Sequence, residues 1–154
     1  MALPEDPSAF VAAAERGINF YDVDATAAVY ADDGRLENYV DGAFESWHGA
    51  DAIRSAWGAY LDAMRERGFT LRKSLLSAAG DTIVNTWVGS LGGRTDAHGI
   101  EYWRFDDAGK VREHRMYSLM NVKASTNPLA RLRMALAYPA SALAFLKARK
   151  RAGL

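Results

Sequence analysis

The sequence of 154 residues contains no cysteine. Disulfide-stapled scaffolds, thiolate zinc sites and cysteine nucleophiles are therefore excluded, and the composition fits a reducing compartment. Hydrophobic residues make up 49% of the chain and charged residues 25%, which is typical of a globular domain and excludes disorder as the main state. A chain of this length predicts one domain with a real core.

The chain also has no net charge, because 19 basic and 19 acidic side chains balance. This argues against a general nucleic-acid binder, which normally shows a strong basic excess. The balance is uneven along the chain: residues 127–154 hold six basic side chains and no acid, which leaves 13 basic and 19 acidic side chains in residues 1–126. We expect the basic tail to form a helical arm over the acidic body, the pocket mouth or a partner subunit; contact with an anionic membrane surface is the alternative.

Several further signals are missing. No apolar run approaches the ~20 residues that span a bilayer, and the acidic start of the chain lacks the features of a secretory leader, so we expect a cytoplasmic protein. There is no glycine-rich phosphate loop, no Gly-x-Ser-x-Gly elbow and no His-x-x-x-His spacing among the three histidines. We therefore expect neither a metal nor a cofactor.

The periodicity of the chain changes from helical to extended and back. Helices are predicted over 8–15, 22–30 and 49–67, a turn over 31–34, and a loop or hairpin over 40–48. Strands are predicted over 35–39, 69–77, 82–91, 98–105 and 111–119. Helical spacing returns from residue 128, split by Pro139. The sequence thus predicts an α+β domain (1–126), a cone-shaped curved antiparallel sheet wrapped on three N-terminal helices with a pocket inside, followed by a C-terminal helical arm (127–154).

Three segments carry a resemblance to a known family: VYADDGRLENYV (29–40), HGADAIRSAW (48–57) and EYWRFDDAGKVREHRMYS (101–118). With the order of elements, they resemble the nuclear transport factor 2-like superfamily over residues 9–119, and within it the SnoaL-like proteins and ketosteroid isomerases. The resemblance implies a homodimer. The superfamily holds isomerases, dehydratases, polyketide cyclases, epoxide hydrolases and non-catalytic binding modules, so the fold does not choose the function.

The family's functional positions are only partly matched. The isomerases' general-base Asp corresponds to Asn38, and an amide cannot abstract a proton at neutral pH. Epoxide hydrolases carry an Asn there to hold a water, but their catalytic Asp falls at Met116. The isomerases' oxyanion-hole Asp corresponds to Glu101, whereas their oxyanion-hole Tyr falls at Ala14.

The last predicted hairpin offers a different acid–base pair. Pairing about a turn near Asp107 makes partner numbers sum to about 215, which places Glu101 opposite His114. A carboxylate beside an imidazole at the mouth of an apolar cavity can transfer protons; the alternative is a cross-strand ion pair on a wet face. Side chains predicted to contact the substrate are Asn38, Trp57, Tyr60, Trp103, Met116 and Ser118.

These features predict a cofactor-independent enzyme that acts on a small apolar cyclic carbonyl compound of polyketide, steroid or terpenoid type. Glu101 and His114 are its expected catalytic groups, for an isomerisation, dehydration or cyclisation. Two alternatives stay open: a non-catalytic small-molecule-binding or dimerisation module, and epoxide-hydrolase-like water addition.

Overall fold

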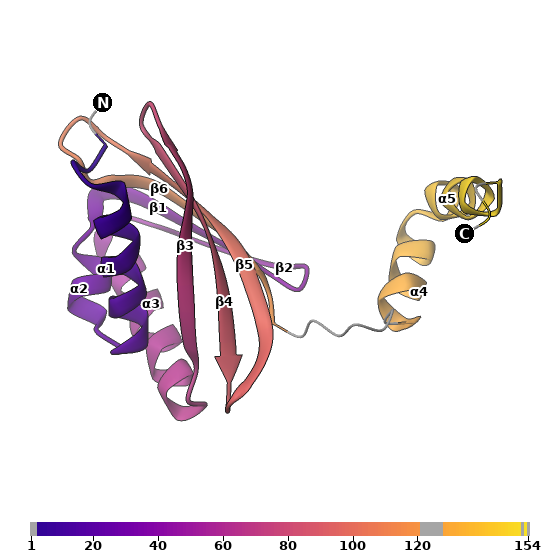
Figure 1. Cartoon of the computed structure of the whole chain (residues 1–154), viewed down its shortest axis with the longest axis horizontal. Coiled ribbons are helices and arrows are strands. Elements are labelled where there is room, and N and C mark those ends of the chain that lie inside the picture. The colour runs from indigo at the N-terminus through magenta and orange to yellow at the C-terminus, as the bar shows by residue number, and fades with distance from the viewer. Residues whose placement is uncertain (1–2, 121–127, 152, 154) are drawn as a thin grey trace. The chain divides into compact units, whose positions relative to one another are not determined.

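The structure is a computed structural model of the whole chain, in which residues 3–120, 128–151 and 153 are described (Figure 1). The chain divides into two units, residues 1–122 and residues 123–154. The predicted boundary between residues 126 and 127 lies outside the described residues. Each unit is described by itself below.

The first unit combines three helices with one curved sheet, as the sequence predicts. The sheet has six strands, of which five correspond to the predicted ones, and the sixth (Ala43–His48) lies in the segment predicted as a loop or hairpin. Its helices are α1 (Pro7–Asn19), α2 (Val23–Ala27) and α3 (Ala50–Glu66). Its strands are β1 (Tyr30–Val40), β2 (Ala43–His48), β3 (Thr70–Ala79), β4 (Thr82–Leu91), β5 (Arg94–Phe105) and β6 (Val111–Leu119). The strand order is β2-β1-β6-β5-β4-β3, and only the β1–β6 pair is parallel. The three helices lie on one face of the sheet (Figure 1), with α1 packed on β3 and α3 on β1.

Carboxylates start the first two helices. Asp6 Oδ1 accepts a hydrogen bond from the Ala9 amide, and Asp22 Oδ1 accepts one from the Ala25 amide, both at 2.9 Å. The predicted range of the first helix, 8–15, is too short, because α1 runs from Pro7 to Asn19 and continues through Gly17. Gly17 is a close-packing position instead: a Cβ there would lie 2.6 Å from Thr26 Oγ1 of α2.

The predicted turn over 31–34 is also wrong, and so is the extension of the second helix to Tyr30. Tyr30 and residues 31–34 belong to β1. Their pairing with β6 is irregular, because the register shifts between Tyr30, which pairs with Val111, and Arg35, which pairs with Glu113. The predicted loop or hairpin at 40–48 is a hairpin. Its two-residue turn, Asp41 and Gly42, has φ of 48° and 88°, which matches the twist of the paired strands.

The edge strand β3 is closed by side chains of α1. The Asn19 side chain makes two hydrogen bonds to the backbone of Leu71, at 2.8 and 2.9 Å. Glu15 Oε2 accepts a third from the Lys73 amide at 2.7 Å. Unpaired strand edges invite aggregation, so α1 both satisfies this edge and fixes β3 beside the space between helices and sheet.

The core lies between the helices and the inner face of the sheet. Its most deeply buried side chains include Leu36, Ile53, Leu61, Phe69, Ile83, Phe105 and Val111. Phe10 of α1 closes one end by edge-to-face contacts with Trp103 and Phe105, at centroid distances of 5.2 and 5.1 Å. Midway between the helices and the sheet, by contrast, the interior contains buried polar side chains and a cavity.

The second unit consists of α4 (Pro128–Ala137) and α5 (Pro139–Arg151), and the split at Pro139 confirms the prediction. Exposed apolar side chains run along both helices: Leu129, Leu132, Leu136, Leu143, Phe145 and Leu146. Basic side chains gather in the last turn of α5, at Arg149, Lys150 and Arg151. Among the described residues, no helix is both long enough and apolar enough to cross a membrane.

Substitution by alanine is predicted to have opposite effects on stability at two glycines of the first unit. A Cβ at Gly99 would press on the Tyr117 carbonyl and lie 2.6 Å from the Trp87 ring, so we expect Gly99→Ala to lower the free energy of unfolding by about 1–3 kcal/mol. Gly58 lies inside α3 with open space around it, so Gly58→Ala should raise it by up to about 1 kcal/mol. Urea denaturation measures both; an equal or more stable Gly99→Ala protein contradicts the close packing.

Candidate functional site

An apolar pocket of about 210 Å³ lies between the helices and the inner face of the sheet. Five of the six predicted substrate contacts line it: Asn38, Trp57, Tyr60, Met116 and Ser118. The other lining residues are Ile18, Val40, Met64, Phe69, Leu71, Trp87, Glu101 and Met120. An engineered cavity of ~150 Å³ holds benzene, so this pocket suits a compound of about one ring. Predominantly apolar walls with a few placed polar groups are typical of small-molecule sites.

Trp103 lies outside this pocket, beside a second and smaller cavity of about 90 Å³. That cavity is lined by Phe10, Lys73 and Trp103, among others, and shares Ile18 and Trp57 with the larger one. Trp103 thus stands behind the pocket wall and does not form its surface.

A buried ion pair is the main polar feature of the pocket. Glu101 is 3% exposed, and its Oε2 accepts hydrogen bonds from Lys73 Nζ and, at 2.8 Å, from Asn85 Nδ2. Asn85 in turn accepts from Trp103 Nε1 at 2.7 Å. Both of these hydrogen bonds are on Oε2, whereas Oε1 has no hydrogen-bond partner among the described residues. Breaking a buried pair of this kind costs about 3–5 kcal/mol.

The predicted pairing of Glu101 with His114 is wrong by two residues. Glu101 lies opposite Met116, and His114 lies opposite Trp103. Two effects of one residue each add up. The partner numbers already sum to 216 next to the turn, where Phe105 pairs with Val111. A bulge then raises the sum to 217, because Arg104 pairs with Glu113 and Arg112 has no partner in the register. Because the shift is even, the predicted face is retained. The side chains of Glu101, Trp103, His114 and Met116 are all buried.

His114 is enclosed by aromatic side chains and lines neither of the two inner cavities. Its ring stacks on Trp103 at a centroid distance of 3.4 Å, and its Nδ1 lies 2.6 Å from Tyr30 Oη. Tyr30 Oη already accepts a hydrogen bond from Trp57 Nε1 at 3.1 Å. The direction of the hydrogen bond between Tyr30 Oη and His114 Nδ1 depends on the His114 tautomer, and His114 Nε2 is buried without a hydrogen-bond partner among the described residues.

Burial, with the nearby Lys73 charge, holds the pKa of His114 well below its usual range. Burial likewise raises the pKa of Tyr30. Both groups are therefore neutral at neutral pH. His114 and Tyr30 form a hydrogen-bonded pair behind the pocket, and Glu101 is the acidic residue that lines the pocket itself.

A second polar chain crosses the mouth of the pocket. Asn38 of β1 and Glu45 of β2 are direct cross-strand partners, and Tyr60 of α3 bridges them. Asn38 Nδ2 donates to Tyr60 Oη at 2.8 Å, and Tyr60 Oη donates to Glu45 Oε2 at 2.6 Å. Partial burial and this hydrogen bond raise the pKa of Tyr60. Asn38 Oδ1 is buried and has no hydrogen-bond partner among the described residues.

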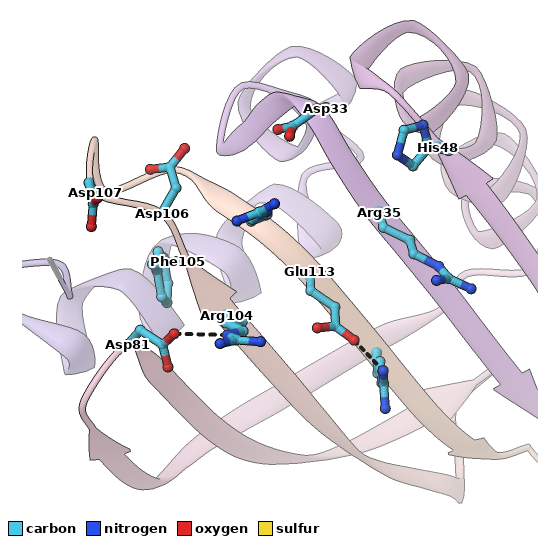
Figure 2. A pocket seen from close by; sticks show the side chains of 11 residues that line it. Asp33, Arg35, His48, Asp81, Arg104, Phe105, Asp106, Asp107 and Glu113 are labelled. Carbon is cyan, nitrogen blue, oxygen red and sulfur yellow. Dashed lines mark hydrogen bonds and ion pairs between the residues drawn. The ribbon is translucent and has the colours of Figure 1, made fainter. Parts of the chain in front are cut away.

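A larger hollow, of about 880 Å³, lies on the outer face of the sheet near the β5–β6 turn (Figure 2). Arg35, His48, Arg104 and Glu113 line it from four strands, with Asp81 from a turn. Its charges largely neutralise one another: Arg104 pairs with Asp81 at 2.8 Å, and Arg115 with Glu113. Within the described part of the chain, no three histidine or acidic side chains are placed to hold a metal ion. The inner pocket, with its unsatisfied acceptor and buried carboxylate, is the better candidate site.

Three residues of the inner site were not anticipated from the sequence: Tyr30, Lys73 and Asn85. Lys73 alternates with Leu71 and Leu75, which face inward on β3, and Asn85 sits at such a position on β4. The sequence did offer one signal for both residues: each is a polar residue at a strand position that the alternation of apolar side chains assigns to the inner face. The role of Tyr30 was not predicted, because its helical spacing with Val23 and Ala27 assigned it to the second helix.

The fold and this pocket define the class of protein. The sequence profile of the SnoaL-like domain matches residues 9–114, so the chain belongs to the SnoaL-like family and the resemblance to the nuclear transport factor 2-like superfamily is confirmed. No curated protein gives a significant match.

Solved structures share the fold at low sequence identity. A SnoaL-like protein of unknown function from Burkholderia thailandensis superposes with a TM-score of 0.61 at 16% identity, over 76% of this chain and 98% of that one. SalBIII, an epoxide hydrolase/cyclase-like enzyme of pyran ring formation in salinomycin, gives 0.57 at 18%, over 73% and 89%. RV0760c of Mycobacterium tuberculosis, in complex with estradiol-17beta-hemisuccinate, gives 0.55 at 20%, over 73% and 94%.

The buried state of His114 predicts a pH dependence of stability. The unfolded histidine binds a proton below pH ~6.5 whereas the folded one resists it, so stability falls as pH falls through that value. We expect the unfolding free energy of the wild type to fall by up to about 1.4 kcal/mol per pH unit more than that of His114→Gln below pH ~6.5. Urea titrations from neutral pH to pH ~5 measure the difference. Parallel curves would contradict a neutral, buried His114.

Proposed function

We propose that this chain is a cofactor-independent enzyme that moves a proton on a small apolar cyclic compound. Isomerisation, dehydration or cyclisation of a carbonyl compound would each need such a step. The observation that carries the proposal is the Glu101 carboxylate, which lines an apolar pocket while Lys73 and Asn85 hold its other oxygen. His114 supports the site from behind and is not a catalytic residue of this proposal.

The arrangement fits a general base. A base must be held in one orientation within reach of the substrate, and the two donors on Oε2 restrict rotation of the Glu101 carboxyl group. Apolar walls exclude water, which strengthens electrostatic interactions with the reacting groups. The volume of about 210 Å³ favours a one-ring compound over a complete steroid.

Two relatives by fold support an apolar cyclic ligand. One of them, RV0760c, is known in complex with an estradiol derivative, and the other, SalBIII, takes part in pyran ring formation. The alternative of a non-catalytic binding module has its own supporting observation. Asn38, an amide, stands at the family's base position, and Glu101 already has a buried cationic partner.

Substitution of Glu101 tests the catalytic role. We expect Glu101→Gln to lower the enzymatic rate by about 10²–10⁴-fold, because an amide cannot accept the proton. The assay is deuterium incorporation next to the carbonyl of one-ring ketones, with and without a hydroxyl group, followed by proton NMR in D₂O. Asp81→Asn, which removes a carboxylate from the outer hollow, is the matched control and should keep the rate.

Folding must be separated from catalysis in this test. Glu101→Gln leaves the Lys73 ammonium buried without its counter-charge, which destabilises the protein. The double variant Lys73→Met/Glu101→Gln removes both charges and should recover much of the stability without recovering the rate. A folded double variant with wild-type exchange, or no exchange by the wild type on any ketone of the panel, would reject the catalytic proposal.

We further propose that two copies associate through the outer face of the sheet. An apolar row crosses β2, β1, β6 and β5, formed by Phe44, Tyr39, Tyr117 and Ile100, and all but Tyr39 are exposed. The Tyr39 ring stacks on Tyr117 at a centroid distance of 4.8 Å, and it contacts the tilted ring of Phe44 at 4.7 Å. Exposed apolar patches of this kind mark interaction surfaces.

Light scattering tests the association. The wild type should give twice the chain mass of 16.9 kDa, and Tyr117→Arg should give the monomer mass, because it places a charge in the apolar row. Leu76→Arg, at an exposed leucine of β3 outside the row, should remain dimeric. A monomeric wild type would refute the proposal.

A further inference from the structure

Asn38 presents a fixed hydrogen-bond acceptor at the pocket. The orientation of an asparagine amide follows from its hydrogen-bond network, and here the network leaves one solution. A carboxylate only accepts hydrogen bonds, so the contact of 2.6 Å between Tyr60 Oη and Glu45 Oε2 uses the single phenolic proton. Tyr60 Oη can then only accept from Asn38, at 2.8 Å, which turns Nδ2 toward Tyr60 and leaves Oδ1 as the free end.

The raised pKa of Tyr60 agrees with this direction of donation, because the phenol keeps its proton throughout the neutral range. Asn38 Oδ1 is buried and lacks a partner among the described residues, while Asn38 lines the pocket. A buried acceptor without a partner costs about 1–3 kcal/mol, so a donor that reaches it gains both a hydrogen bond and relief of that cost.

Glu101, the second polar group of the pocket, is also a hydrogen-bond acceptor. Glu101 accepts from Lys73 and Asn85 and lines the pocket as a carboxylate acceptor. The Trp57 indole N–H, which could have donated to a ligand, is already engaged by Tyr30. Ser118, which also lines the pocket, has a hydroxyl group that can donate as well as accept. A carbonyl oxygen placed at Asn38 Oδ1 or at the Glu101 carboxylate would meet an acceptor, whereas a hydroxyl group placed there matches it. In a substrate with both groups, Ser118 is a donor that can meet the carbonyl.

We infer that the compound bound in this pocket carries a hydroxyl group that donates to Asn38 Oδ1, and that the Asn38–Tyr60–Glu45 chain selects hydroxylated ligands over their ketones. The inference rests on the proposed function for the identity of the pocket as the binding site. It refines the chemical class of the ligand, and it concerns binding alone.

Menthol and menthone test the selectivity. They share one carbon skeleton of a single ring and differ only in hydroxyl against carbonyl. Binding, followed by quenching of tryptophan fluorescence or by calorimetry, should favour menthol by about tenfold. Asn38→Leu, which keeps the side-chain size and removes the acceptor, should abolish the preference.

A second variant tests the orienting chain with Asn38 still in place. In Tyr60→Phe the amide loses its anchor and can turn Nδ2 toward the ligand, so the preference for menthol should shrink mainly through tighter binding of menthone. Tyr102→Phe, which removes a phenol from another position on the sheet, is the matched control and should keep the preference. Circular dichroism of each variant establishes that it is folded.

Equal or tighter binding of menthone by the wild type would overturn the inference, as would a preference that survives in Asn38→Leu. Failure of menthol to bind at millimolar concentration would overturn it too. The outcome is separable from that of the proposed catalysis. A menthol preference without deuterium exchange on any ketone keeps the inference and rejects the enzyme, whereas exchange without the preference rejects the inference alone.

Discussion

The organisation of this domain depends on one buried ion pair, Lys73 with Glu101. Two charges removed from water are tolerated only when their geometry and remaining hydrogen bonds are good. The sheet meets this requirement by placing Asn85 beside Glu101 and Trp103 beside Asn85. Helix α1 contributes from the other side, because Glu15 holds the backbone amide of Lys73. A carboxylate is thereby kept in an apolar cavity that hydrophobic packing alone would fill.

The buried polar groups of the domain fall into two kinds, those that support the pocket wall and those that line the pocket. Tyr30, Trp57 and His114 hydrogen-bond to one another behind the pocket wall, and burial keeps Tyr30 and His114 neutral. His114 Nε2 is buried and has no hydrogen-bond partner among the described residues. Glu101 and Asn38 line the pocket, and each has one side-chain oxygen without a hydrogen-bond partner among those residues. The supporting groups thus hold one another in place while the two lining residues keep acceptors for a ligand, and a site held in this way has its geometry before any ligand is bound.

The sequence predicted the architecture well because hydrophobic alternation is a local property. Strand β4 was predicted with its observed bounds, and the inward face of the last hairpin was correct even though its register was not. The register depended on the turn and on the bulge at Arg112. The bulge interrupts the alternation between Val111 and His114, which are three residues apart and both buried, and the sequence alone did not indicate at which residue the pairing shifts. Tyr30 was placed in a helix for a related reason: Val23, Ala27 and Tyr30 share helical spacing, but pairing with β6 decided its conformation.

The site was harder to predict because its key contacts join distant strands. Lys73 and Glu101 are 28 residues apart in the chain, and nothing local to Lys73 indicates a partner. Even the residues that were anticipated have roles that the sequence could not assign. Asn38 was identified as a departure from the family's base, yet its meaning comes from Tyr60 and Glu45, which fix the direction of its amide. If Asn38 stands where the isomerases carry their base, as the resemblance implies, an oriented acceptor replaces a base there, and a site can change in this way while the surrounding fold stays the same.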